Sequence, residues 1–198
     1  YTLVKKETEE TFVKYLQRHV GFANEKFNEY LKQTGNIFSH RACFIPNTAI
    51  AFLFAKAFRN TKVFVMNVEH DWLHYTDFCK HGLLEAFKEV AKAQNKNFIL
   101  VLDALNITQP ECGLRPLLNF INNEVPTFDG FTGQFPNNLT IMATLLPTTG
   151  ENPVGLKLPN NYFNEWFAIG DPAEETDKVY LPQDFNNFEI KGNIGFVE

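Results

Sequence analysis

The segment Phe98–Leu102 limits the fold of this chain more than any other, because five consecutive apolar residues (FILVL) end at Asp103. An uninterrupted apolar run of this length is typical of a strand buried on both faces of a parallel sheet. Such a strand requires neighbouring strands and a covering layer of helices on each face. Other short apolar runs predict four further strands, at Ala42–Ile45, Lys62–Val68, Leu139–Thr144 and Phe167–Ile169.

Helical patterns alternate with these predicted strands. The segments are Thr48–Phe58, which is apolar nearly all round, Asp77–Asn95 and Leu114–Ile121. Strands and helices that alternate at this spacing favour right-handed crossovers and a sheet that is covered on both faces. We therefore predict a three-layer α/β domain with about five mainly parallel strands.

The 198 residues divide into three predicted parts. Two helical patterns between Glu7 and Thr34 indicate a helical N-terminal extension over residues 1–36. The α/β core covers residues 37–171, and a polar C-terminal tail with a hairpin pattern covers residues 172–198. Because the sequence begins at Tyr1 rather than at methionine, we expect a domain fragment of a longer protein.

The charge balance argues against nucleic acid as a partner. The formal net charge is -5, and only four of the 18 basic residues are arginines. Domains that bind nucleic acid usually carry a basic patch, so we expect no direct nucleic acid binding. No apolar run approaches the about 18 residues that indicate a membrane-spanning helix. Three widely spaced cysteines favour free thiols in a reducing compartment, which predicts a cytoplasmic protein.

The segments around the predicted strands carry motifs in a recognisable order. They are Phe44–Phe58 in the place of a Walker A loop and helix, Val63–Phe78 in the place of a second strand and an Asp-Trp loop, Phe98–Asn106 as a Walker B strand, Ile107–Asn122 as the helix after it, Asn138–Pro147 as a sensor-1 strand, and Leu158–Asp171 as a segment that carries arginine fingers. In this order they resemble the nucleotide-binding core of AAA+ ATPases, most closely the McrB-like branch of ring-forming motor domains. The resemblance implies a P-loop NTPase-like fold over the core.

The Walker A positions depart from the family pattern G-x-P-G-T-G-K-[ST]. That loop needs glycines so that backbone N–H groups approach the phosphates, a lysine for the β- and γ-phosphates, and a hydroxyl for Mg²⁺. Pro46 and Thr48 are kept. The substituted positions are Phe44, Asn47 and Ala49 for the three glycines, Ile50 for the lysine and Ala51 for the hydroxyl. Mostly apolar side chains therefore stand where a polyanion should bind.

The other motifs are also incomplete. Asp103 remains in the Walker B segment, but Ala104 replaces the second acid, which would orient the attacking water. Thr144 remains near the sensor-1 position. The further substitutions are Leu146 at sensor 1 itself and Asn164, Glu165 and Trp166 at the expected basic positions of the arginine-finger segment. These losses predict a degenerate P-loop and no catalytic residues.

The expected function is therefore that of a pseudo-ATPase, a structural or protein-interaction module without a cofactor. Its partners would be proteins, including other AAA+ subunits of a larger ring or multi-domain assembly, with DNA restriction or defence machinery as a context by analogy. The loops Glu69–Phe78 and Thr127–Asn138 would contact these chains. The helical lid that follows the core in the family has no counterpart in the 27 residues after Asp171.

Two further interpretations of the same residues stay open at this point. A divergent ATPase completed by a neighbouring subunit would bind ATP and Mg²⁺ through Thr48, Asp103 and Thr144. For Asp103 a structural role as the cap of the next helix or turn is favoured over that of a vestigial metal ligand, because Ala104 after it is not acidic. In the same way Phe44–Phe58 can be read as a plain strand followed by a buried helix.

Two local patterns suggest other chemistry. A zinc site would use His70, His74, Cys79 and His81, which lie within twelve residues together with Asp71 and Asp77. The spacing of His70 and His74 would place both on one helical face, although HDWLH lacks the glutamate of HExxH. A cysteine nucleophile at Cys43 or Cys79 has no local signature. The phenylalanines of the loop 128–138 would either form an exposed binding surface or fold back on the core.

Overall fold

The computed structural model describes residues 41–45, 48–57, 60–122, 127–128, 131–132, 134–151, 153–163 and 166–168. The predicted helical extension (1–36) and the predicted polar tail (172–198) lie outside these residues. In the described part, no helix combines the length and the apolar character that crossing a membrane would require.

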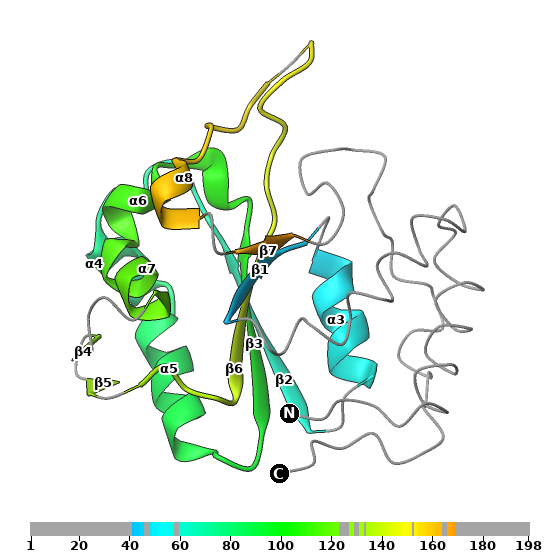
Figure 1. The fold of residues 1–198 in the computed structure, drawn as a ribbon, viewed down its shortest axis with the longest axis vertical. Coiled ribbons are helices and arrows are strands. Elements are labelled where there is room, and N and C mark those ends of the chain that lie inside the picture. Colours follow the sequence, from blue (N-terminus) through cyan, green and yellow to red (C-terminus); the bar gives the residue numbers. More distant parts are fainter. Residues whose placement is uncertain are drawn as a thin grey trace.

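A five-stranded sheet forms the centre of the described core (Figure 1). Its strand order is β2-β3-β6-β1-β7, and each neighbouring pair runs parallel. The strands are β1 (Ala42–Phe44), β2 (Thr61–Asn67), β3 (Asn97–Asp103), β6 (Leu139–Ala143) and β7 (Phe167–Ala168). The predicted α/β class with a parallel sheet is confirmed.

The apolar run of β3 lies inside the sheet, as the sequence predicts. Residues Phe98–Leu102 are at most 1% exposed, because β2 pairs along one side of β3 and β6 along the other. Side chains alternate between the two faces of a strand, so Phe98 and Leu100 enter one apolar layer and Ile99 the opposite one. Both faces of β3 must therefore be covered.

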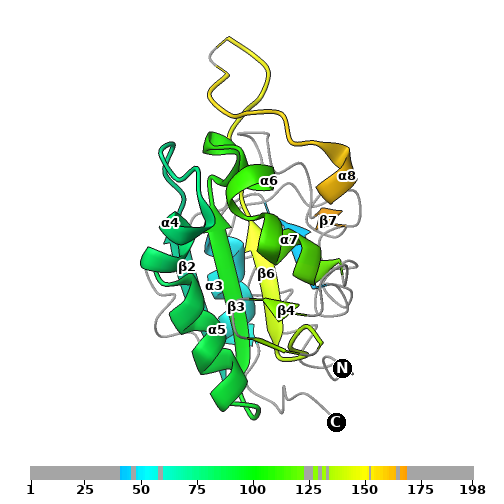
Figure 2. The ribbon, with the colours of Figure 1, turned by 90° about the vertical axis from the view of Figure 1, so that its left-hand side faces the viewer.

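Helices cover both faces of the sheet (Figures 1 and 2). The helix α3 (Thr48–Ala57) lies alone on one face among the described helices. The opposite face carries four helices, α4 (Tyr75–Lys80), α5 (Leu83–Lys92), α6 (Pro110–Gly113) and α7 (Arg115–Ile121). Two short elements complete the core, the 3-10 helix η1 (Leu105–Ile107) and the helix α8 (Asn160–Phe163).

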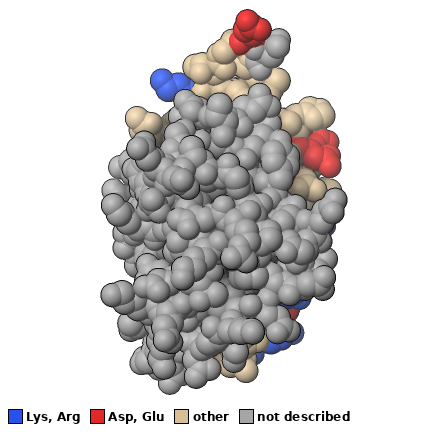
Figure 3. Space-filling view, turned by 90° about the vertical axis from the view of Figure 1, so that its right-hand side faces the viewer, with Lys and Arg blue, Asp and Glu red and all other residues tan. Residues whose placement is uncertain are grey.

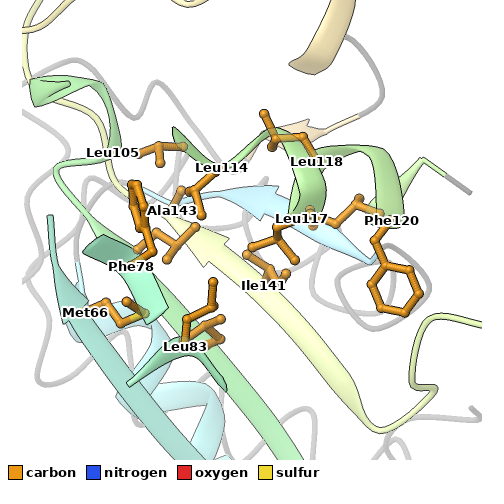
Figure 4. Packing of buried hydrophobic residues seen from close by; sticks show 14 of the residues in the cluster. Met66, Phe78, Leu83, Leu105, Leu114, Leu117, Leu118, Phe120, Ile141 and Ala143 are labelled. Atoms are coloured by element: carbon orange, nitrogen blue, oxygen red, sulfur yellow. The ribbon is translucent and has the colours of Figure 1, made fainter. Parts of the chain in front are cut away.

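A continuous apolar core lies between the sheet and the four-helix face. Figure 4 shows Leu83 of α5, Leu117 and Phe120 of α7, and Ile141 of β6 converging there. These four side chains are at most 2% exposed. Full burial of one such side chain contributes about 1.5–3 kcal/mol to stability, so this core accounts for the attachment of α5 and α7 to the sheet.

The prediction of one helix over Asp77–Asn95 is wrong. The chain instead forms α4 and α5, which are separated by His81 and Gly82. Gly82 has a φ of 105°, a conformation that glycine adopts far more readily than other residues. The glycine ends the first helix and redirects the chain before Leu83 enters the core.

The segment expected as a loop over Thr127–Asn138 also contains regular structure. Its first part forms the two-stranded antiparallel pair β4 (Thr127–Phe128) and β5 (Phe131–Thr132). Phe135 is 3% exposed, with its ring centroid 5.4 Å from that of Phe120. Of the two interpretations offered for these phenylalanines, folding back on the core holds for Phe135.

The edge strand β2 carries a charged pair on its exposed surface. Lys62 Nζ lies 2.7 Å from Glu89 Oε1 of α5 and 4.8 Å from the ring centroid of Phe64. The pair is partly exposed, and exposed ion pairs contribute about 0–1 kcal/mol. The pair lies on β2, the strand at one end of the sheet order.

The end of α5 depends on one buried amide. Asn138, which precedes β6, donates from Nδ2 to the backbone oxygens of Val90, Ala93 and Lys96 at 3.3, 3.2 and 3.0 Å. The last carbonyl groups of a helix have no partner within the helix. Asn138 therefore satisfies carbonyl groups at the end of α5 and joins that helix to the sheet.

Replacing Asn138 with alanine should destabilise the fold by about 1–3 kcal/mol, because the buried carbonyl group of Val90 and the partly buried one of Lys96 lose this donor. Urea denaturation followed by circular dichroism measures the change. Asn95→Ala is the matched control, since Asn95 is exposed and should change stability by less than about 0.5 kcal/mol. Equal stabilities of the two variants would contradict this role for Asn138.

Candidate functional site

The carboxyl ends of β1, β3 and β6 lie side by side because β6 stands between the other two strands. The backbone bonds at this edge are Ile45 N to Ala143 O at 2.9 Å and Thr144 N to Leu102 O at 3.1 Å. Ligands of open α/β sheets bind beyond the carboxyl ends of the strands. The segments that follow these three strands are the predicted Walker A, Walker B and sensor-1 segments, so the fold brings all three together.

Asp103 and Thr144, two of the predicted vestigial residues, contact each other directly. Thr144 Oγ1 donates to Asp103 Oδ1 at 2.6 Å and accepts from the backbone N–H of Ala104 at 2.8 Å. The Asp103 side chain thus bonds across to the neighbouring strand end rather than capping the next helix. A structural role for Asp103 is observed, with a different partner from the one that its sequence position suggests.

Ala104 occupies the position of the missing second acid. Its backbone is in the left-handed region, with φ 55° and ψ 43°, a conformation that costs a residue other than glycine roughly 1–2 kcal/mol. The turn directs the chain from β3 into η1. The methyl side chain provides no group that could orient a water molecule.

Phe44 and Trp166, substituted positions of two different motifs, pack against each other. Their ring centroids are 5.0 Å apart, and Phe163 of α8 lies 6.0 Å from Phe44 and 5.2 Å from Trp166. All three rings are at least nine-tenths buried. The indole Nε1 of Trp166 has no hydrogen-bond partner, which is consistent with an apolar aromatic cluster.

The described beginning of α3 is apolar as well. Ile50 and Ala51, at the positions of the P-loop lysine and hydroxyl, are 6% and 0% exposed. Thr48, the first residue of the helix, is half-buried. Ala49 lies in the helix, and only its backbone belongs to the described part of the structure. The remaining predicted positions, Pro46, Asn47, Asn164 and Glu165, fall outside the described residues.

Asn106 is a structural residue that the sequence reasoning missed. Its side chain is fully buried and holds the chain that follows β6. Oδ1 accepts from Leu146 N at 2.6 Å, and Nδ2 donates to the backbone oxygens of Leu146 and Leu156 at 2.9 and 3.1 Å. The only signal in the sequence is a polar residue between Leu105 and Ile107. Leu146, the substituted sensor-1 position, is held here through its backbone.

The histidines of the proposed zinc site have other surroundings. His81 stacks on Trp72 at a centroid distance of 4.2 Å, and the backbone N–H of His74 donates to Asp77 Oδ2 at 2.9 Å at the start of α4. Among the residues that the structure describes, which include His70 and Cys79, no three His, Cys, Asp or Glu side chains form a group that could hold a metal ion. The geometry therefore lends no support to the zinc hypothesis.

Cys43 is unsuited to act as a nucleophile. It lies in β1 and is completely buried, and this burial raises its pKa to about 12. The reactive form of a cysteine is the thiolate, which Cys43 does not form near neutral pH. Cys112, by contrast, is exposed.

No protein-family model matches the chain, and no curated protein or solved structure matches it either.

The burial of Cys43 predicts selective labelling. At pH 8, a thiol reagent should modify Cys112 rapidly and Cys43 only after unfolding, because a pKa near 12 leaves a negligible fraction as thiolate. Mass spectrometry of peptides from native and denatured protein locates the label. Equal labelling rates of Cys43 and Cys112 in the native protein would contradict the buried position.

An Asn106→Asp substitution should destabilise the fold by about 3 kcal/mol at pH 7, because a buried carboxylate cannot donate to two carbonyl groups. Burial raises the pKa of a carboxyl group, so the folded pKa would exceed the unfolded value of about 3.9. The loss of folding stability is then fully present above the folded pKa, and it shrinks as the pH falls through this pKa. Urea denaturation at several pH values tests this, with exposed Asn161→Asp as the control. A pH-independent difference between the variants would argue against the buried donor role.

Proposed function

We propose that this chain is a catalytically inactive AAA+-like domain that serves as a structural or protein-interaction module. The first support is topological. A parallel sheet places the segments after β1, β3 and β6 at one edge, and these are the segments whose motifs resemble Walker A, Walker B and sensor 1. A P-loop-like domain requires this convergence, since the nucleotide must touch all three segments.

The contact between Phe44 and Trp166 is the main support for the proposal that the domain is catalytically inactive. A phosphate site needs exposed backbone N–H groups and cations that face the oxygens. Here the first glycine position and an arginine-finger position are occupied by rings whose centroids lie 5.0 Å apart. Both rings are more than nine-tenths buried. An aromatic cluster of this kind stabilises the fold and offers nothing to a polyanion.

The remaining polar groups are committed to each other. The Thr144 hydroxyl donates its proton to Asp103 and accepts from the Ala104 backbone N–H, so it has no proton left to donate to a nucleotide. No acid follows Asp103. The motif positions thus carry neither the cations nor the second acid on which phosphoryl transfer depends.

A domain that keeps its fold but does not catalyse a reaction would act by binding other proteins through its surface. We propose protein partners, including other AAA+ subunits in a ring or in a multi-domain assembly, and a cytoplasmic location. Nucleic acid is not proposed as a direct partner, because the chain carries a net charge of -5.

The second candidate function is nucleotide binding without independent catalysis. One observation favours it: the Asp103 carboxylate is only half-buried, at the edge where the second candidate would place Mg²⁺. This chain would then bind ATP and Mg²⁺ through Thr48, Asp103 and Thr144. Residues of a neighbouring subunit would complete the binding site.

Thermal unfolding with and without millimolar Mg-ATP separates the two candidates. The inactive domain should show no shift of Tm. A bound ligand at 100 times its Kd would add about 2.7 kcal/mol, which is a shift of several degrees for a domain of this size. Asp103→Asn is the matched variant: a shift that this substitution abolishes would establish the second candidate and sink the first.

A further inference from the structure

Exposed apolar side chains gather on two loops. Among the described residues four large hydrophobic side chains are exposed, and three of them belong to the loops after β2 and β6. Leu73 is 52% exposed in the loop 69–74, and Val154 and Leu156 are 62% and 43% exposed in the loop 144–159. Single exposed apolar residues are ordinary, but three residues on two loops that follow neighbouring parts of one sheet call for a physical account.

The two loops share one anchor, the segment after β3. Thr108 Oγ1 donates to the backbone oxygen of Trp72 at 3.0 Å, next to Leu73. Asn106 accepts from the backbone N–H of Leu156 at 2.7 Å and donates to its oxygen at 3.1 Å. Since Asn106 and Thr108 are two residues apart, at most about 7 Å of chain separates the two anchoring points.

The anchor is rigid because its polar groups are buried. Asn106 and Thr108 are 0% and 2% exposed. Gly155 packs so closely against the Asn106 side chain and the Leu146 oxygen that an added Cβ would overlap them. A surface held in place before binding loses little conformational entropy when a partner arrives. The base of the loop 144–159 is preorganised in this sense.

Both loops stand at the same end of the molecule. Figure 1 shows the chain between β6 and α8 projecting beyond the sheet, and Figure 2 shows the chain between β2 and α4 rising at that end.

The charges around these apolar residues are mostly acidic. Glu69 and Asp71 are exposed beside Leu73, and Glu151 is exposed in the second loop. Lys157 is the only lysine or arginine in either loop. Figure 3 shows both acidic and basic side chains at this end of the molecule. Interfaces are arranged so that a negative surface meets a positive one.

We propose that the loops 69–74 and 144–159 together form a docking surface for a protein segment that combines apolar with basic side chains. The inference rests on the proposed function as an interaction module and names its surface and its partner chemistry. Leu73, Val154 and Leu156 supply the apolar contact, and Glu69, Asp71 and Glu151 meet the basic residues. A symmetric pairing of two copies would oppose like charges, which disfavours a second copy as the occupant.

A pair of labelled peptides tests the surface. One is an amphipathic peptide of leucine and lysine, and the other has the same pattern with glutamate in place of lysine. Fluorescence anisotropy should show that the lysine peptide binds the full chain at least tenfold more tightly than the glutamate peptide. The double variant Leu73→Ser, Leu156→Ser should weaken binding of the lysine peptide at least tenfold.

Val65→Ser is the matched control, because Val65 is the fourth exposed hydrophobic residue and lies in β2 outside both loops. It should change the affinity less than twofold, and all variants should keep the Tm of the parent chain. Three results would overturn the proposal: unchanged binding by the double variant, an equal loss in Val65→Ser, or equal affinity for both peptides.

Self-association is a separate outcome. Sedimentation that reveals a dimer of the parent chain, lost in the double variant, would replace the basic partner with a second copy and overturn the partner assignment. The nucleotide question is independent of these results. A Tm shift with Mg-ATP would refute the inactive domain and leave the docking surface standing.

Discussion

Burial of β3 on both faces is the constraint on which the rest of the structure depends. The backbone of a central strand must be paired on both sides, and its apolar side chains must be covered above and below. β2 and β6 meet the first demand, while α3 on one face and α5 with α7 on the other meet the second (Figure 1). Parallel strands are joined by crossovers, so every strand returns to the same edge, and the segments after β1, β3 and β6 are neighbours for that reason.

At this edge the protein uses its polar groups internally. Asp103, Thr144 and the Ala104 backbone form one bonded set, and Asn106 bonds the chain that follows β6. Buried polar groups without partners cost free energy, and these groups find their partners within the chain. Beside them, Phe44, Phe163 and Trp166 fill the edge with aromatic contacts. Together these features make the edge a stable end of the domain and leave the adjoining loops as its outer surface.

The sequence predicts the strands well because continuous apolar runs, such as that of β3, admit few other structures. It predicts the separation of α4 and α5 poorly, since one glycine at Gly82 interrupts an otherwise helical pattern. The motif positions of the candidate site are predicted by the resemblance alone. The placement of these segments at one edge of the sheet follows from the strand order. The contact of Phe44 with Trp166 joins residues more than a hundred positions apart, and no local pattern indicates it. The role of Asn106 is equally hidden, because it depends on a loop that only the folded sheet brings near.

The lysine on β2 has a consequence for the behaviour of the protein in solution. β2 is one of the two outermost strands of the described sheet, with β7 at the other end, and an outer strand is a template on which a second chain can add its own strand. Lys62 stands on this strand with its charge held by Glu89 and its stem over Phe64. A strand from another molecule that paired here would have to accommodate that charge. The ion pair thus adds little to folding stability, and a charged lysine on an outer strand is of the kind that opposes edge-to-edge pairing of sheets.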